Sequence, residues 1–187
     1  MKINWYKLSI LLIISMAAIG LVSCASEKPV TESPPATSAP EATPGWMEIE
    51  LTDVATGETF KISDFKGTPI LLESFAVWCP TCLAQQKEMK KLVDAEGEAI
   101  IHISLDTDPN EDEARVKEHI ERNDLNWYFV VSPQELTNAL IDEFGLRIVS
   151  APTAPVILIC EDQSTRFLGR GIKSADKLLS ETAAGCN

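Results

Sequence analysis

The segment Trp78-Cys79-Pro80-Thr81-Cys82 constrains this chain most strongly, because it lies where one sequence periodicity gives way to another. Residues 69–77 before it are largely apolar, which is typical of a short buried strand. A helix is predicted from residue 83 to residue 93, because Leu83, Gln86, Met89, Lys90 and Val93 recur at three- and four-residue steps, and Gly97 is expected to end it. Two cysteines three positions apart, where a strand passes into a helix, indicate a redox-active disulfide.

The first cysteine has a physical reason to be reactive. A helix N-terminus carries free N–H groups and partial positive charge, and both stabilise a thiolate. We therefore expect Cys79 to be the nucleophile. Cys82 lies about one turn further on and is the expected resolving thiol, and Pro80 is tolerated in the first turn of the helix.

A zinc site is the main alternative for a Cys-x-x-Cys pair. A structural zinc site needs four ligands, often two such pairs. The remaining candidates in the chain are not paired at ligand spacing, so we predict no metal site and assign the histidines no role. These candidates are Cys160, Cys186, His102 and His119.

Four stretches of the chain, taken in order, resemble the thioredoxin superfamily, and within it the membrane-tethered TlpA/ResA-like thiol–disulfide oxidoreductases. The resemblance covers residues 46–187 and implies an α/β thioredoxin fold, with a central mixed β-sheet flanked by helices and an N-terminal β-hairpin extension. The four stretches are 60–67, 73–82, 100–106, and 144–147 with the prolines that follow.

The resemblance also implies a function. Such a protein exchanges disulfides with protein thiols outside the cytoplasm and needs no cofactor, because the dithiol carries the two electrons. It implies a reductant, acting on apocytochrome c or other exported thiols and recharged by a membrane electron donor. The Pro80-Thr81 dipeptide differs from the Gly-Pro of thioredoxin, which leaves an oxidant that introduces disulfides as the alternative.

Other classes on this fold fit the sequence less well. Copper-delivery proteins on this fold have a Cys-x-x-x-Cys motif and a distant histidine. This chain lacks that combination. Peroxiredoxins need a threonine two or three residues before their cysteine, where this chain has Val77-Trp78. A non-catalytic binding module leaves both active-site thiols unexplained.

Glu73 is the third predicted catalytic residue. It is an acid within an apolar strand, six residues before Cys79, and it falls where thioredoxin carries its buried acid. A buried carboxyl group has a raised pKa and can transfer protons near neutral pH. We expect it to exchange a proton with Cys82, although a glutamate at a strand end facing solvent is the alternative.

Three residues are expected to contact substrate. Trp78 offers apolar contact to a partner, or else simply packs. The family's cis-proline precedes a strand, and here Pro152 and Pro155 compete for that place. We expect Pro155, because choosing Pro152 leaves Pro155 inside the strand that follows, where proline loses a ladder hydrogen bond.

The last two cysteines are a candidate structural pair. In the implied fold, the strand that ends at Cys160 runs away from the active site, and the final helix ends at the same pole, near Cys186. We therefore expect a Cys160–Cys186 disulfide, which an oxidising compartment permits.

The N-terminal region predicts export and tethering. Residues 1–23 have two lysines and an apolar run typical of a signal peptide, and Leu21-Val22-Ser23-Cys24 looks like a lipobox that makes Cys24 the lipidation site. An uncleaved anchor is the alternative. Either way we expect an extracytoplasmic protein, with residues 24–45 as a proline-rich tether to the membrane and residues 46–187 as the folded domain.

The charge balance excludes one class of partner. Without residues 1–23 the chain has 14 basic and 28 acidic residues. Such an excess of negative charge argues against nucleic acid as a partner.

The rest of the sequence predicts the other strands, helices and turns of the domain. Alternation predicts an N-terminal hairpin with strands at 47–51 and 59–62. The acidic loop at 106–110 fails the EF-hand pattern and is expected to be a turn with a helix cap. We expect strands at 100–105, 126–131, 155–160 and 165–168, and helices at 111–123, 133–144 and 174–184.

Overall fold

The computed structural model describes residues 43–186. The predicted signal peptide, Cys24 and most of the predicted tether lie outside these residues. No helix between residues 43 and 186 has the length and apolar character needed to cross a membrane.

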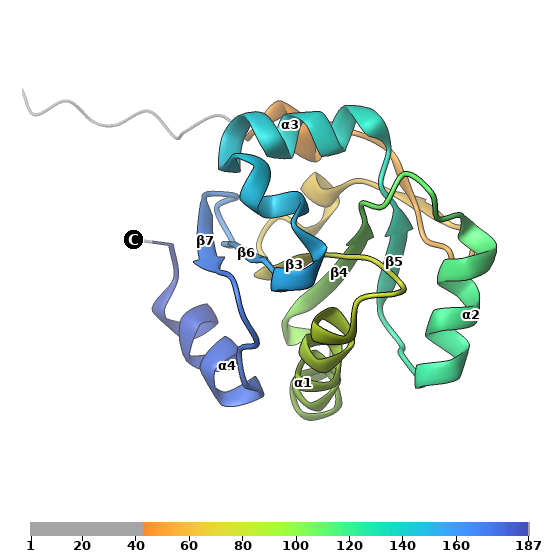
Figure 1. Ribbon diagram of the computed structural model, residues 1–187. Coiled ribbons are helices and arrows are strands. Elements are labelled where there is room, and N and C mark those ends of the chain that lie inside the picture. Colours follow the sequence, from red (N-terminus) through yellow and green to blue (C-terminus); the bar gives the residue numbers. More distant parts are fainter. Residues whose placement is uncertain (1–42, 187) are drawn as a thin grey trace, which may run out of the picture. The chain divides into compact units, whose positions relative to one another are not determined.

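A five-stranded mixed sheet lies at the centre of the fold, in the order β5-β4-β3-β6-β7 (Figure 1). β3 pairs in parallel with β4, which pairs in parallel with β5, whereas β6 is antiparallel to both β3 and β7. The predicted mixed sheet is therefore confirmed. The strands are β3 (Ile70–Phe75), β4 (Ile101–Asp106), β5 (Tyr128–Val131), β6 (Val156–Ile159) and β7 (Thr165–Gly169).

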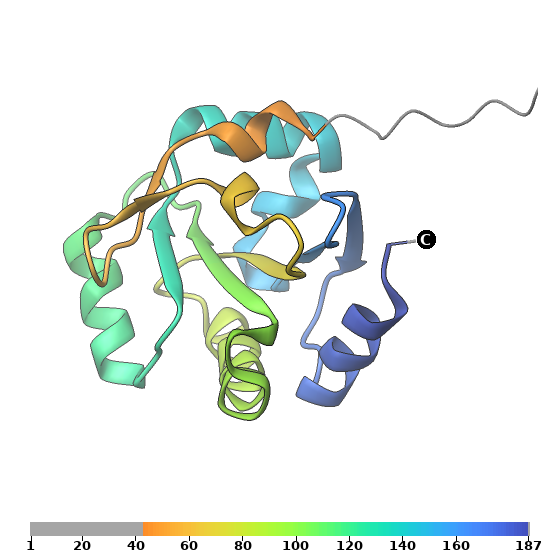
Figure 2. The same cartoon turned by 180° about the vertical axis from the view of Figure 1, so that it is seen from behind.

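Helices cover both faces of this sheet. α1 (Pro80–Glu96), α2 (Glu113–Asn123) and α4 (Ala175–Ala184) pack on one face, around a core that includes Leu71 and Phe75. α3 (Gln134–Phe144) covers the other face with the N-terminal segment, as the reverse view in Figure 2 shows. Because both faces are covered, all six residues of β3 are buried, as its apolar sequence predicts.

Local signals set the helix boundaries. Asp112 accepts the N–H of Arg115 at the start of α2, and Ser174 caps α4 in the same way. Gly97 ends α1 and Gly145 ends α3, each with a positive φ that suits glycine. The predicted helices therefore agree with the structure to within a few residues.

The N-terminal hairpin is shorter than predicted. β1 (Leu51–Thr52) pairs with β2 (Thr59–Phe60), but Gly45–Glu48 forms a 3₁₀ helix where a strand was expected. Trp46 and Met47 are adjacent and both buried within this 3₁₀ turn, which departs from the alternation of buried and exposed residues that a strand at the edge of the domain would show. The prediction of a strand from residue 47 was therefore wrong.

Candidate active site

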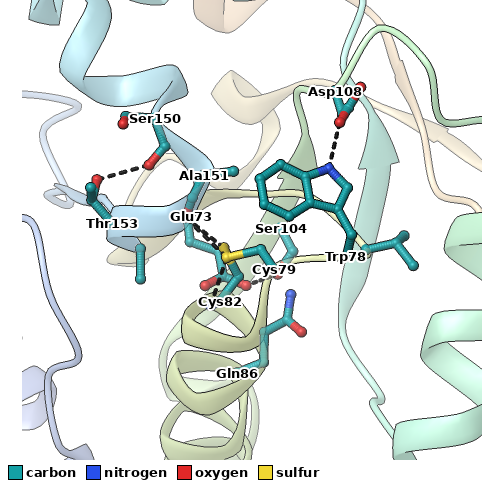
Figure 3. The surroundings of a disulfide bond; sticks show 12 residues. Glu73, Trp78, Cys79, Cys82, Gln86, Ser104, Asp108, Ser150, Ala151 and Thr153 are labelled. Atoms are coloured by element: carbon teal, nitrogen blue, oxygen red, sulfur yellow. Dashed lines mark hydrogen bonds between the residues drawn. A yellow bond between two sulfur atoms is a disulfide. The ribbon is translucent and has the colours of Figure 1, made fainter.

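The N-terminus of α1 holds the redox-active pair (Figure 3). A disulfide joins Cys79 and Cys82, whose Cα atoms are 5.3 Å apart. Cys79 is the N-cap of α1, and its Sγ accepts the backbone N–H of Cys82 at 3.0 Å. This N–H and the partial positive charge of the helix end stabilise a thiolate on Cys79 when the disulfide is reduced.

The carbonyl oxygen of Ala151 lies directly against the disulfide. It is 3.1 Å from Sγ of Cys79 and 2.7 Å from Sγ of Cys82. Ala151 begins a single 3₁₀ turn, Ala151–Thr153, that packs on the start of α1. In the dithiol state this carbonyl is placed to accept a hydrogen bond from either thiol.

Neither Pro152 nor Pro155 has the cis peptide bond that was predicted for one of them. Every peptide bond among residues 43–186 is trans, so the expected cis-proline is absent from this part of the chain. Pro152, which follows Ala151, is exposed beside the disulfide. Pro155 is buried, and its carbonyl accepts the N–H of Ser74. The prediction of a cis-proline is therefore wrong for both residues, and of the two it is Pro152 that lies at the surface beside the 3₁₀ turn.

Trp78 forms one wall of a groove next to the disulfide. Its side chain is 58% exposed, and its Nε1 donates a hydrogen bond to Oδ2 of Asp108 at 2.6 Å. The groove has a volume of about 320 Å³, and Val149 and Pro152 also line it. The groove reaches Ala151, whose carbonyl oxygen contacts the sulfurs, whereas Cys79 and Cys82 are themselves buried.

Glu73 lies buried beneath the cysteines, at the fourth position of β3 (Figure 3). Its Oε1 accepts a hydrogen bond from Oγ of Ser104 at 2.7 Å, and Ser104 in turn accepts one from Nε1 of Trp127. Burial removes the carboxylate from water and raises the pKa of Glu73 to about 7, although the hydrogen bond from Ser104 opposes that rise. The solvent-facing alternative for Glu73 is therefore excluded.

Two further acids, which the sequence analysis missed, are buried near the cysteines, and one of them holds the segment that precedes them. Oε2 of Glu111 accepts the backbone N–H of Val77 at 2.6 Å. Asp106 is buried at the end of β4, and its Oδ1 accepts the N–H of Asp108. Burial, with Glu111 nearby, raises the pKa of Asp106 to about 7. The sequence offered one signal for Asp106, because it ends a predicted parallel strand and should therefore lie at the same edge of the sheet as the end of β3, next to the cysteines.

Within residues 43–186, neither histidine forms a hydrogen bond with Cys79 or Cys82. His102 is buried in β4, neither ring nitrogen has a partner within residues 43–186, and burial lowers its pKa to about 4. Nε2 of His119 lies 2.7 Å from Oε1 of Gln86 on α1. Within the described part of the chain, no three acidic, histidine or cysteine side chains converge as a metal site would require.

The second cysteine pair lies at the other end of β3. A disulfide joins Cys160 and Cys186, with Cα atoms 6.0 Å apart. In the antiparallel register Ile70, at the start of β3, pairs with Ile159, whereas Glu73 pairs with Val156. Cys160 therefore lies at the pole opposite Cys79, and its disulfide ties the end of the chain to the sheet.

A family model described as Redoxin matches residues 34–181. The thiol:disulfide interchange protein DsbE of Vibrio cholerae is 44% identical over 46 residues, which are 24% of this chain and 25% of that protein. The chain thus matches about a quarter of the length of this relative.

Solved structures share the fold over most of the described chain. A secreted disulfide oxidoreductase of Mycobacterium tuberculosis has a TM-score of 0.59 at 17% identity and covers 74% of this chain and 97% of its own. The exposed lipoprotein thioredoxin Etrx1 of Streptococcus pneumoniae has a TM-score of 0.55 at 22% identity, covering 73% and 98%. The chain therefore has the thioredoxin fold.

Proposed function

Because the chain belongs to the Redoxin family, we propose that it is a thiol–disulfide oxidoreductase that exchanges disulfides with protein cysteines through Cys79 and Cys82. The observation that carries this proposal is the disulfide at the N-terminus of α1 with the buried Glu73 beneath it. The similarity to the interchange protein of Vibrio cholerae supports the same reaction.

The first step of a reduction uses Cys79 as nucleophile. Its thiolate attacks one sulfur of a substrate disulfide, which breaks the substrate S–S bond and forms a mixed disulfide with Cys79. The other substrate sulfur leaves as a thiolate. The N–H of Cys82 and the helix N-terminus stabilise the attacking thiolate, and the groove beside Trp78 holds the partner segment.

The second step uses Cys82 and Glu73. The carboxylate of Glu73 takes the proton of the Cys82 thiol, and the resulting thiolate attacks Sγ of Cys79. The Cys79–Cys82 disulfide forms, and the second substrate sulfur leaves as a thiolate. Two electrons have then passed from the dithiol to the substrate. A pKa near 7 suits this role, because such a group gives and takes protons readily at neutral pH.

We assign the protein the reductant direction, with a membrane electron donor that restores the dithiol. We also propose that it acts outside the cytoplasm, held at a membrane by a lipidated Cys24 or an uncleaved N-terminal segment. The Cys160–Cys186 disulfide supports an oxidising compartment, since structural disulfides persist there and are rare in the cytosol.

The reduction potential of the Cys79–Cys82 pair tests the proposal. It is measured on the chain without its signal segment, against glutathione and dithiothreitol series, with Cys160 and Cys186 followed separately by mass. A value of about −270 mV supports a reductant, and a value of about −120 mV makes the protein an oxidant. Absence of any reversible couple contradicts the exchange activity and favours a binding module.

A Cys82→Ser variant gives a second test. It removes the resolving thiol, so a mixed disulfide between Cys79 and a partner protein is expected to accumulate. Partners captured this way, and lost in the Cys79→Ser variant, identify the substrates. Equal capture by both variants contradicts the assignment of Cys79 as nucleophile.

A further inference from the structure

We propose that Lys173 is a positioning residue for the exchange reaction: its buried ammonium group stabilises the ionised form of Glu73. The inference rests on the proposed function, because that function uses the Glu73 carboxylate as a proton acceptor. Lys173 lies in the loop before α4, a hundred residues after Glu73 in the chain.

The backbone of Lys173 is fixed from both sides by one side chain. Gln85 is fully buried on α1, three residues after Cys82. Its Oε1 accepts the N–H of Lys173 at 2.7 Å, and its Nε2 donates to the carbonyl oxygen of Lys173 at 3.1 Å. The same helix that presents the cysteines therefore fixes the position of Lys173.

The side chain of Lys173 runs inward, and the residue is only 8% exposed. Its Nζ donates to the carbonyl oxygens of Ala154 at 3.0 Å and Gly171 at 2.7 Å. Within residues 43–186 it forms no ion pair shorter than 4.0 Å. A charged group so placed lacks both full hydration and a direct counter-ion, and its charge acts on its surroundings with little screening.

These contacts place the ammonium group close to the active site. Ala154 follows the turn that begins at Ala151, whose carbonyl oxygen touches both sulfurs. Two residues after Ala154, Val156 pairs directly with Glu73 in the sheet. Nζ is therefore held beside the start of β6, which is the end of that strand that pairs with Glu73.

The charges of the two groups act on each other in opposite senses. Burial lowers the pKa of Lys173 to about 8, and the nearby Glu73 carboxylate opposes that change. The positive charge of Lys173 in turn lowers the pKa of Glu73, against the larger effect of burial. At neutral pH Lys173 is still mostly protonated, so it supports the carboxylate in the range where Glu73 titrates.

The other groups around Glu73 do not supply this charge. α1 contributes the two cysteines, which become negative on ionisation, and β4 contributes the neutral hydroxyl of Ser104. α2 contributes His119, next to Gln86, and burial lowers the pKa of His119, which favours the neutral ring. Lys173 is therefore the group whose charge favours ionised Glu73.

The experiment measures the pKa of Glu73 directly, by carboxyl ¹³C NMR on the chain without its signal segment, in the reduced and oxidised forms. In Lys173→Met the pKa of Glu73 is expected to rise above its wild-type value. Lys173→Arg keeps a positive charge and is expected to leave the pKa close to wild type. Lys117→Met is the matched control, because it removes an exposed lysine on α2 and changes net charge equally.

A reciprocal measurement keeps the test decisive if Lys173→Met does not fold. Coupling between two titrating groups acts equally in both directions. Glu73→Gln is therefore expected to lower the pKa of the Lys173 ammonium group, followed by ¹⁵N NMR at Nζ. An unchanged Glu73 pKa in Lys173→Met, or an unchanged Lys173 pKa in Glu73→Gln, overturns the proposal.

A kinetic readout connects this coupling to the reaction. The pH profile of the rate of mixed-disulfide resolution is expected to shift to higher pH in Lys173→Met. In Lys117→Met the profile is expected to stay as in the wild type. The NMR titrations need no catalytic activity, so they separate failure of this inference from failure of the proposed function. A pKa shift without any exchange activity contradicts the proposed function alone.

Discussion

The indole nitrogen of Trp78 donates a 2.6 Å hydrogen bond to Oδ2 of Asp108, so a large exposed aromatic side chain is held in one orientation. The bond joins the residue before the nucleophile to the loop that follows β4. This bond lowers the pKa of Asp108, and the hydrogen bond from the backbone N–H of Asn110 lowers it further.

The Trp78–Asp108 bond is expected to affect binding of the protein substrate. Asp108→Ala frees the indole, and loss of one net hydrogen bond of about 0.5–1.5 kcal/mol corresponds to a rise in KM of roughly 2- to 12-fold. Asp108→Asn keeps an oxygen acceptor and is expected to lie closer to wild type. The measurement is the KM for a disulfide-containing protein, and an equal effect of both variants contradicts the role of the bond.

Glu73→Gln is expected to slow the resolution of the mixed disulfide. General acid–base groups contribute about 10²- to 10⁴-fold, and the Gln side chain cannot accept the proton of Cys82. Attack by Cys79 in the first step does not use Glu73 and is expected to change much less. Stopped-flow measurement of both steps across pH 5–9 checks this, and a resolution step that keeps its dependence on pH near 7 contradicts the role of Glu73.

The same substitution is expected to raise stability at high pH. The pKa of Glu73 is raised from 4.5 to about 7 in the folded protein. Such a group contributes its full stability below pH 4.5, and that contribution is lost as pH rises toward 7, because the unfolded chain ionises more easily. The free energy of unfolding of Glu73→Gln relative to wild type should therefore increase between pH 4.5 and 7, by about 3 kcal/mol at most.

Urea unfolding at several pH values measures this difference. The change with pH is the informative quantity, since the altered hydrogen bonding of Gln adds a contribution that is the same at every pH. A difference that stays constant from pH 4 to pH 8 contradicts the burial of an ionisable Glu73.

Glu111 is expected to stabilise the active-site segment through the backbone N–H of Val77. Glu111→Ala leaves that N–H without its acceptor and is expected to cost about 1–3 kcal/mol in the free energy of unfolding. Glu111→Gln keeps an oxygen in reach and is expected to cost less. Hydrogen exchange at the Val77 amide, faster in the Ala variant than in the Gln variant, separates this local effect from general destabilisation.

The Cys160–Cys186 disulfide is expected to contribute stability without redox function. The two cysteines are 26 residues apart in the chain, and a loop of that length corresponds to roughly 3–4 kcal/mol on the chain-entropy model. The double variant Cys160→Ala/Cys186→Ala should lose about that much in urea unfolding. Its Cys79–Cys82 reduction potential should stay at the wild-type value, and a shifted potential contradicts a purely structural role.

The elements of the domain could be predicted because their signals are local. The buried strand β3 and the stop of α1 at Gly97 each depend on neighbours in the chain, so pattern alone located them. The 3₁₀ turn at Trp46-Met47 could not be located this way. Its burial depends on packing with the face of the sheet that α3 covers, which no short window of sequence contains.

Within the active site, the sequence by itself determined the cysteine pair and favoured a buried Glu73, because the change of periodicity and a lone acid in an apolar strand are visible along one segment. The tertiary structure alone decided which proline lies beside the disulfide, and which distant side chains reach that segment. Ala151 and Glu111 contact this segment, and Lys173 contacts the helix that follows it, at sequence separations of 34 to 88 residues. Such meetings depend on sheet register and helix packing, which arise only when the whole core forms.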